Sequence, residues 1–105
     1  MVYTLTSFEV VQGRMKEAKD WNKRFFAYIR KAYGLEVQSM QALAGTAGEA
    51  NRILAITPYD SLNAWAAHME KVATDTQRTA LISEAFEEKQ YFVANQASRI
   101  LYVTF

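Results

Sequence analysis

The sequence has no cysteine, and only one histidine and one proline, in 105 residues. Without cysteine there is no disulfide, no thiolate metal ligand and no cysteine nucleophile. Because His68 is the only imidazole, a metal site with several histidines cannot form within one chain. Any role for an imidazole base therefore falls on His68, whose ordinary pKa of about 6.5 suits proton transfer.

The sequence also lacks an excess of either charge and any long apolar run. Twelve basic and eleven acidic residues leave a net charge of +1, which gives no overall field for nucleic acid or an anionic membrane. Its apolar runs extend over only a few residues, whereas a bilayer span needs about 20. The first residues resemble a strand and not a secretion signal. We therefore expect a cytoplasmic protein without nucleic-acid or membrane partners.

Length and composition indicate one small folded domain. The 105 residues leave no room for a second core, so residues 1–105 are predicted to form a single domain. Half of the residues are apolar and 22% are charged, which is typical of a globular protein. A chain of this length buries roughly two thirds of its unfolded surface, so extra burial against a partner would stabilise it.

The first half of the chain predicts a strand followed by a long helix. Val2–Val11 is rich in β-branched and aromatic residues, as strands are. After Gly13, apolar residues recur every three or four positions and predict a helix that ends at Gly34 in a left-handed cap. The stripe that this helix should bury consists of Met15, Ala18, Asn22, Phe25, Phe26, Ile29 and Tyr33.

Two further strands are predicted next, over Leu35–Ala44 and Asn51–Thr57. The glycine-bearing turn at 45–50 indicates that they form a hairpin. Pro58 is expected to end the second strand, because proline cannot donate a hydrogen bond to the sheet.

The remainder predicts a broken helix and a final strand. Asp60 or Ser61 can cap a helix whose apolar stripe is Leu62, Trp65, Ala66, Met69, Val72 and Ala73. Thr74 and Gln77 have the spacing of a capping box, so a second short helix should start there. This helix should turn Leu81, Ile82, Ala85 and Phe86 inward. Residues 90–96 give no clear pattern, and Ser98–Phe105 predicts a strand.

The order βαββαβ predicts a ferredoxin-like α+β fold, with a four-stranded antiparallel sheet and helices on one face. Both faces of this sheet should be apolar. One parity of the strands carries Leu5, Val37, Leu54 and Val103, and the other carries Phe8, Met40, Ile53 and Tyr102. The helices can cover only one face. We therefore expect the second face to pack against another copy of the chain in a two-fold homodimer.

This pattern resembles the dimeric α/β-barrel superfamily, and in particular its small stand-alone NIPSNAP-like and antibiotic-biosynthesis-monooxygenase-like members. The resemblance covers nearly the whole chain, and its most specific parts are Tyr59–Trp65 (YDSLNAW) and Thr74–Gln77 (TDTQ). It implies that two sheets face each other and close a barrel. The superfamily includes cofactor-free monooxygenases of aromatic polyketides, isomerases, a cyclase and many members without known activity, so it implies fold more than function.

The haem-degrading monooxygenases of this superfamily can be compared residue by residue. They use an asparagine, a tryptophan and an axial histidine. Trp65 matches the tryptophan, but Ser7 and Asp75 stand at the other two places, and His68 is only one helical turn from Trp65. Neither serine nor aspartate replaces an imidazole ligand. We therefore expect no haem and no other cofactor.

Candidate ligand-binding residues lie on the inward stripes of the two helices. Phe25, Phe26, Trp65 and Met69 either fill the core or line a cavity for a small apolar or aromatic molecule, with Tyr3, Tyr59 and Tyr102 at its rim. His68 flanks this stripe. It is either a partly exposed residue at the helix shoulder or a base or polar anchor at the cavity mouth, and it is the only candidate catalytic residue.

Charged residues suggest few other sites. Arg52 and Arg99 lie in predicted strands, where they can pair with Glu9 and Glu36 or, alternatively, face an anion together. Glu84, Glu87 and Glu88 lack a histidine at ligand spacing, so no metal site is expected. RNA-recognition domains share this order of elements, but they need aromatic residues on the third strand, and residues 52–56 (RILAI) have none.

Three functions remain open from the residues alone. The first is a domain that binds a small apolar or aromatic metabolite between sheet and helices. The second is a cofactor-free monooxygenase or isomerase of aromatic or polyketide-like substrates. The third is a structural interaction dimer without a ligand. A cavity beside Trp65 and His68 would favour the first two over the third.

Overall fold

The structure is a computed structural model that describes residues 1–41, 51–94 and 97–105. The turn expected at 45–50 and the end of the strand expected at Leu35–Ala44 lie outside the described residues. The chain forms, in order, β1 (Val2–Glu9), α1 (Met15–Tyr33), β2 (Gln38–Gln41), β3 (Arg52–Tyr59), α2 (Leu62–Val72), α3 (Thr76–Ser83), the π-helical turn η2 (Glu84–Glu88) and β4 (Ser98–Val103).

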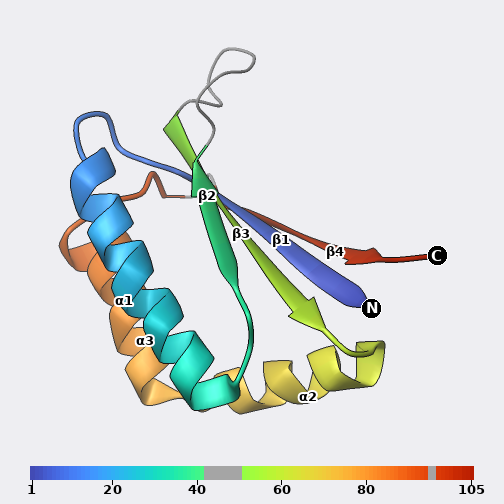
Figure 1. Cartoon of the computed structure of the whole chain (residues 1–105). Helices are drawn as coiled ribbons and strands as arrows, with labels where there is room; N and C mark the ends of the chain where they lie inside the picture. The colour runs from blue at the N-terminus through green and yellow to red at the C-terminus, as the bar shows by residue number, and fades with distance from the viewer. Residues whose placement is uncertain (42–50, 95–96) are drawn as a thin grey trace.

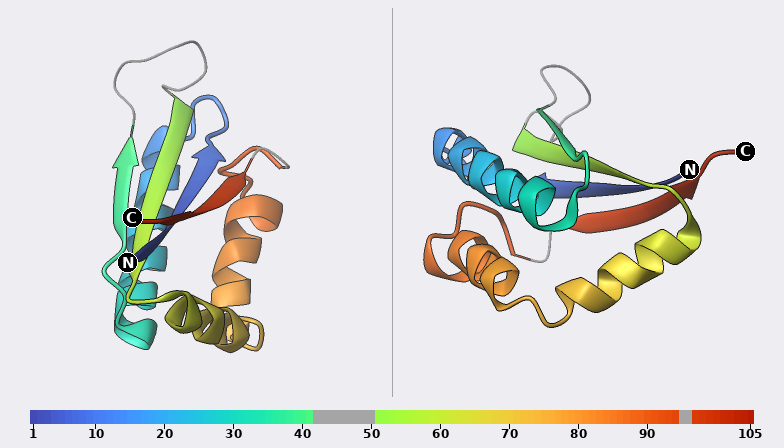
Figure 2. Two further views of the ribbon diagram at one scale, coloured as in Figure 1. Left: turned by 90° about the vertical axis from the view of Figure 1, so that its right-hand side faces the viewer. Right: turned by 60° about the horizontal axis from the view of Figure 1, so that its bottom comes forward.

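These strands form a four-stranded antiparallel sheet in the order β2-β3-β1-β4. The helices lie on one face of the sheet, and the other face is bare of helices in the described ranges (Figure 1). Figure 2 shows α1 and α3 side by side on the helix-covered face, with α2 running across one end of the sheet. The ferredoxin-like α+β fold expected from the order of elements is thus confirmed. None of the described helices combines the length and apolar composition that a membrane crossing requires.

Helix α1 follows its sequence pattern closely. Its buried residues are Ala18, Trp21, Asn22, Phe25, Phe26 and Ile29. It ends as expected at Gly34, which has the left-handed φ of 67° and donates its N–H to the Arg30 carbonyl at 2.9 Å. The two lysines nearest its centre, Lys19 and Lys23, are exposed. The apolar stripe of the sequence was therefore sufficient to place this helix and its buried face.

An aromatic cluster fixes the helices to the sheet. The Trp21 ring stacks on Phe25 with centroids 4.8 Å apart, and its indole N–H donates to the Leu81 carbonyl at 2.8 Å. Phe92 is 2% exposed, and its ring lies 5.3 Å from that of Trp21. Phe92 also forms an isolated bridge with Val10. Two buried aromatics, Tyr91 and Phe92, therefore come from a segment that has no clear pattern in the sequence.

Two expectations about element ends were wrong. Strand β3 continues through Pro58, which pairs with Tyr3. Proline is tolerated there because β2 pairs with β3 only up to Ile56, so that beyond it β3 has a neighbour on one side only. The cap of α3 is Asp75 and not Thr74: the Asp75 side chain accepts the N–H of Arg78 at 3.0 Å.

The apolar stripe expected for α2 is also only partly buried. Val72 is its one buried residue, and Leu62 is 57% exposed. The cause is geometric, since α2 crosses the end of the sheet and only part of one face reaches the strands (Figure 2). The cap at Ser61 is as expected: its side chain accepts the N–H of Ala64 at 3.1 Å.

Both faces of the sheet carry apolar side chains, as the strand parities predicted. The helix side takes Phe8 and Ile53, which pair across β1 and β3. Because neighbouring residues of a strand point to opposite faces, the helix-free side takes Leu5, Leu54, Ile56, Met40, Ile100 and Tyr102. Of these, Met40 is 42% exposed and Ile100 and Tyr102 are each 48% exposed. The predicted parity was wrong for three residues: Met40 and Tyr102, expected on the parity of Phe8, lie on the helix-free side, and Val103, expected on the parity of Leu5, lies opposite Val2 on the helix side.

Candidate functional site

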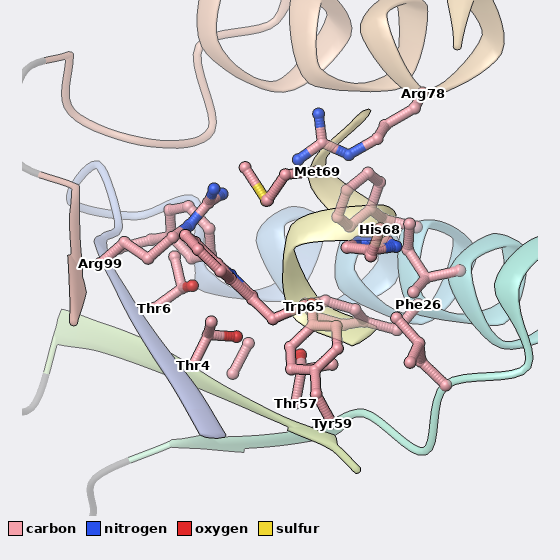
Figure 3. A pocket seen from close by; sticks show the side chains of 15 residues that line it. Thr4, Thr6, Phe26, Thr57, Tyr59, Trp65, His68, Met69, Arg78 and Arg99 are labelled. Atoms are coloured by element: carbon pink, nitrogen blue, oxygen red, sulfur yellow. The ribbon is translucent and has the colours of Figure 1, made fainter. Parts of the chain in front are cut away.

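A cavity lies between the helix side of the sheet and the helices (Figure 3). Its lining residues come from every element that packs around it: Thr4, Thr6 and Phe8 from β1; Phe25, Phe26 and Ile29 from α1; Ala55, Thr57 and Tyr59 from β3; Trp65, His68 and Met69 from α2; Arg78 from α3; Arg99 from β4; and Leu35. The centre of a water-sized molecule can occupy about 60 Å³ of it. That is room for a few waters or a small planar group.

Helix α2 supplies the three side chains that close the cavity opposite the sheet. Trp65, His68 and Met69 have the spacing i, i+3, i+4, which places them on one face of the helix. The Trp65 indole lies between the threonines of the sheet and Met69 (Figure 3). The Ser61 cap fixes where this helix begins, and therefore which of its residues face the sheet.

His68 lies between two tyrosine rings. Its centroid is 4.8 Å from that of Tyr33, with the rings perpendicular, and 5.4 Å from that of Tyr59. Burial lowers the pKa of His68 below its ordinary value, and the positive charges of Arg78, Arg99 and Lys71 lower it further. The imidazole is therefore neutral at physiological pH and can accept a proton or a hydrogen bond.

His68 and Tyr59, together with Leu35, also line an open groove at the end of the sheet. The same three residues therefore form a wall between the inner cavity and the solvent-filled groove. The pKa of Tyr59 is raised, mainly by burial. Its hydroxyl therefore remains protonated at neutral pH. This places one neutral acceptor and one hydroxyl where the cavity meets the groove.

Two arginines form the cationic part of the site. Arg78 and Arg99 reach into the cavity from opposite sides, from α3 and β4 (Figure 3). Burial lowers the pKa of Arg78, and the neighbouring charge of Arg99 lowers it further. The Arg78 guanidinium carbon lies 5.9 Å from the centroid of the Phe25 ring. Neither guanidinium has an ion pair within residues 1–41, 51–94 and 97–105.

The alternative in which Arg52 and Arg99 face an anion together was wrong. Arg99 lies opposite Thr6, on the helix side, whereas Arg52 lies opposite Glu9, on the helix-free side. Arg52 donates to the Ser7 hydroxyl at 2.6 Å. The residue that shares the cavity with Arg99 is Arg78, which the sequence pattern did not single out.

One buried polar atom of the cavity has no hydrogen-bond partner in the described part of the chain. The indole N–H of Trp65 makes no hydrogen bond to any described residue, although the atom is buried. An orphaned donor of this kind costs about 1–3 kcal/mol. The other buried indole, that of Trp21, is satisfied by the Leu81 carbonyl. The difference indicates that the Trp65 N–H is directed at an acceptor that the described residues do not supply.

Asp75 is a carboxylate whose charge acts on Arg78 and partly offsets the lowering of that guanidinium's pKa by burial. It accepts hydrogen bonds from the hydroxyls of Tyr28, at 2.6 Å, and of Tyr33, as well as the backbone N–H of Arg78. The Tyr28 and Tyr33 hydroxyls are the main reasons why the pKa of Asp75 falls to about 2. Asp75 therefore holds the start of α3 against α1 and is ionised at neutral pH.

The structure brings together six of the residues that the sequence proposed. His68, Trp65, Phe25, Phe26, Met69 and Tyr59 all line the one cavity. Tyr3 and Tyr102 do not: they face each other across β1 and β4 on the helix-free side, because their parity is opposite to that of Thr4 and Thr6. The described residues contain no group of three or more His, Cys, Asp or Glu side chains arranged to hold a metal ion.

The chain was compared with known families, curated proteins and solved structures. A family model described as NIPSNAP matches residues 3–105. No curated protein matches the chain. A NIPSNAP domain protein from Burkholderia xenovorans superposes with a TM-score of 0.75 at 18% identity, and the alignment covers 100% of this chain and 95% of that one. A NIPSNAP family protein from Agrobacterium tumefaciens gives a TM-score of 0.77 at 15% identity, with 99% and 92% covered.

The same fold occurs in a cofactor-independent oxygenase. SnoaB from Streptomyces nogalater, in a variant form, superposes with a TM-score of 0.66 at 12% identity, covering 98% of this chain and 91% of that one. Likeness at this level of identity shows a shared fold and does not transfer an activity.

Proposed function

The chain belongs to the NIPSNAP family, and we propose that it binds a small apolar or aromatic metabolite in the cavity between its sheet and helices. The single observation that carries this proposal is the unfilled cavity beside Trp65 and His68, at a place where a chain of this size would ordinarily fill its core. A protein that served only as an interaction dimer has no need to leave this space empty.

The chemistry of the lining supports a planar, largely apolar ligand. Phe25, Phe26 and Ile29 form one wall, and aromatic faces of this kind favour stacking with a ring. The hydroxyls of Thr4 and Thr57 and the imidazole of His68 supply a few polar contacts that can orient the ligand. Since the free space is small, the ligand fits as a single ring, or Met69 moves to admit a larger one.

A cavity-filling substitution tests this function. Planar aromatic compounds are screened by thermal shift, and the best binder is measured by calorimetry with the wild type and with Ala55→Leu. Ala55 is 3% exposed and lines the cavity, so leucine should occupy the ligand space and weaken binding at least about 10-fold. Thr6→Leu fills the cavity from β1 and should do the same.

Ala66→Leu is the matched control, because Ala66 is exposed on α2. It should bind like the wild type. If no compound binds the wild type, or if both filled variants bind as tightly as the control, the proposed ligand site is wrong. Circular dichroism of each variant shows whether it has folded.

A second candidate function is cofactor-free oxygenation of an aromatic or polyketide-like substrate. It is favoured by the placement of Trp65, the neutral His68 and Tyr59 around one cavity, in a fold shared with a cofactor-independent oxygenase. In such a reaction His68 takes a proton from a substrate methylene. The substrate carbanion then reduces O₂, and the methylene ends as a carbonyl with release of water. Oxygen uptake that requires substrate and is lost in His68→Ala would support this function, and unchanged uptake would exclude His68 from it.

We further propose that the chain forms a homodimer through the helix-free face of its sheet. Met40, Ile100 and Tyr102 stand exposed on that face, and the edge strand β4 is exposed along its whole length. Isolated apolar residues on a surface are common, but a whole sheet face with an apolar edge strand invites association. A second copy related by two-fold symmetry covers the same patch on both subunits at once.

A further inference from the structure

We propose that the ligand of this cavity carries a carboxylate, which binds between the guanidinium groups of Arg78 and Arg99 and accepts the indole N–H of Trp65. The inference rests on the proposed ligand-binding function and names the chemical class of the ligand. It is carried by two observations that do not depend on each other: two like charges and a buried donor, none of which has an ion-pair or hydrogen-bond partner among the described residues.

The two guanidinium groups are placed as they would be around an anion. They enter the cavity from opposite walls, and Figure 3 shows their tips on either side of Met69. No carboxylate of the described residues forms an ion pair with either of them. The carboxylate whose charge acts on Arg78, Asp75, already accepts the hydroxyls of Tyr28 and Tyr33. Two cations that share a partly buried space repel each other, so their arrangement makes the empty protein less stable.

A purely structural role does not explain this arrangement. Arg24 shows what a structural arginine does in this chain: it forms a two-pronged ion pair with Glu84, at 2.9 and 2.6 Å. Arg30 similarly donates to the Val37 carbonyl at 2.8 Å. Arg78 and Arg99 have no such partner in the described ranges. A bound anion would supply it.

The orphaned indole N–H of Trp65 points to the same ligand. It is a donor only, so the partner that it lacks must be an acceptor. The imidazole of His68 and the hydroxyls of Thr4, Thr6 and Thr57 can each take either role and do not oppose an acceptor. The guanidinium groups of Arg78 and Arg99 and the indole N–H of Trp65 therefore all favour a ligand with a negatively charged oxygen.

A carboxylate meets these demands better than other anions. Its two coplanar oxygens match the planar fork of a guanidinium, and one oxygen can also accept an N–H. The remaining lining is aromatic and aliphatic, with Phe25, Phe26 and Ile29 opposite the sheet. An aromatic carboxylate places its ring against these side chains and its charge at the arginines. The limited free space favours this flat group over the bulkier tetrahedral phosphoryl group.

The test compares aromatic carboxylates with their neutral isosteres. Benzoate, salicylate and 2-naphthoate are titrated into the full chain by calorimetry at constant ionic strength, each beside its primary amide and, for benzoate, beside phenyl phosphate. We expect the wild type to bind the best carboxylate at least about 10-fold more tightly than its amide. Arg78→Met and Arg99→Met should each weaken carboxylate binding on the order of 10- to 100-fold and leave amide binding nearly unchanged.

Lys16→Gln is the control for net charge, because Lys16 is exposed on α1, outside the cavity. It should not change carboxylate affinity. Arg78→Lys keeps the charge but not the fork, and should restore only part of the affinity.

The stability of the ligand-free variants gives an independent readout. If Arg78 binds the ligand and does not stabilise the fold, Arg78→Met removes its repulsion with Arg99. This variant should then have a higher unfolding midpoint while carboxylate binding is lost. A lower midpoint together with unchanged carboxylate affinity overturns the proposal.

Failure of this inference is distinguishable from failure of the proposed function. Amides that bind as well as carboxylates, in the wild type and in both arginine variants, remove the anion site but leave a ligand-binding cavity. Phenyl phosphate binding more tightly than benzoate shows that the assignment of a carboxylate is wrong. Absence of binding by every compound overturns both.

Discussion

The imidazole of His68 packs edge-on against the ring of Tyr33, with centroids 4.8 Å apart and an angle of 89° between the rings. Tyr33 in turn donates its hydroxyl to Asp75. One short chain of contacts thus joins the cavity wall of α2, the last turn of α1 and the cap of α3. Because these contacts exist only in the folded protein, the pKa values of His68 and of Asp75 should differ between the folded and the unfolded chain, and this difference can be measured.

The titration of His68 predicts a loss of stability in mild acid. Its pKa is lowered in the folded protein by burial and by Arg78, Arg99 and Lys71, whereas in the unfolded chain it is near 6.5. Below that pH the unfolded chain takes up a proton that the folded protein resists. The free energy of unfolding should therefore fall as the pH decreases below about 6.5, by less than the roughly 1.4 kcal/mol per pH unit of a whole proton, because solvent screens the half-exposed ring.

Urea unfolding at several pH values between 5 and 7.5 measures this slope. His68→Gln should flatten it, because no other histidine is present in the chain. A variant with the same slope as the wild type would show that another group, and not His68, carries the pH dependence.

Asp75 predicts a second loss of stability in a lower pH range. Its pKa is lowered to about 2 by the hydroxyls of Tyr28 and Tyr33 and by the N–H of Arg78, whereas an unfolded aspartate titrates near 3.8. The stability that the ionised group contributes is complete above about pH 4 and is lost as the pH falls toward 2. Asp75→Ala should lower the thermal midpoint at neutral pH and remove this acid step.

Asp75→Asn separates capping from charge, because asparagine also caps a helix. It should keep more of the neutral-pH stability than alanine while losing the acid step. Asp20→Asn, on the exposed side of α1, is the matched control and should leave both unchanged. Equal midpoints for the wild type and for Asp75→Ala would contradict the proposed role of the cap.

Phe92 is predicted to be the most costly aromatic side chain to remove from the C-terminal half. It is 2% exposed and contacts the rings of Phe8, Trp21 and Phe86. Phe92→Ala leaves a cavity in this cluster and should reduce the free energy of unfolding by about 3–5 kcal/mol. Phe105→Ala removes the same side chain from a fully exposed position and should change it by less than about 0.5 kcal/mol. Denaturant unfolding of both variants measures these two changes in the free energy of unfolding.

The burial of Phe92 is also a feature that could not be predicted from the sequence. Helix α1 was predictable because its stripe repeats over five turns and ends at a glycine. Residues 90–96 offered no such repeat: Tyr91 and Phe92 lie in irregular backbone after η2 and are held by the bridge of Phe92 to Val10, by backbone hydrogen bonds of Tyr91 to Ala85 and Val11, and by ring contacts. Periodicity cannot detect a buried residue that is fixed only by tertiary contacts.

The candidate site was predictable in its apolar half and not in its cationic half. Trp65, Phe25 and Phe26 follow from helical stripes. Arg78 lies on α3, ahead of the residues that the pattern turned inward, and a single arginine has no periodicity that would place it in a cavity. Which face of the sheet Arg99 takes depends on strand register, and a shift of one residue exchanges the faces.

The helix-free face yields the last prediction, which concerns the oligomeric state. If a second copy covers this face, a charge introduced there should break the assembly. Ile100 is 48% exposed in the single chain, and Ile100→Lys places an ammonium group within the proposed interface, beside Leu5. Sedimentation velocity should show a dimer for the wild type and a monomer for this variant, because an unpaired buried charge costs several kcal/mol.

Leu62→Lys is the control, because Leu62 is more exposed than Ile100, at 57%, but lies on α2, away from this face. It introduces the same charge and should remain a dimer. The comparison tests position and not hydrophobicity alone, since both substitutions replace an exposed aliphatic side chain with lysine. If the wild type sediments as a monomer at micromolar concentration, the proposed homodimer is wrong. The cavity would not be affected, because every residue that lines it comes from a single chain.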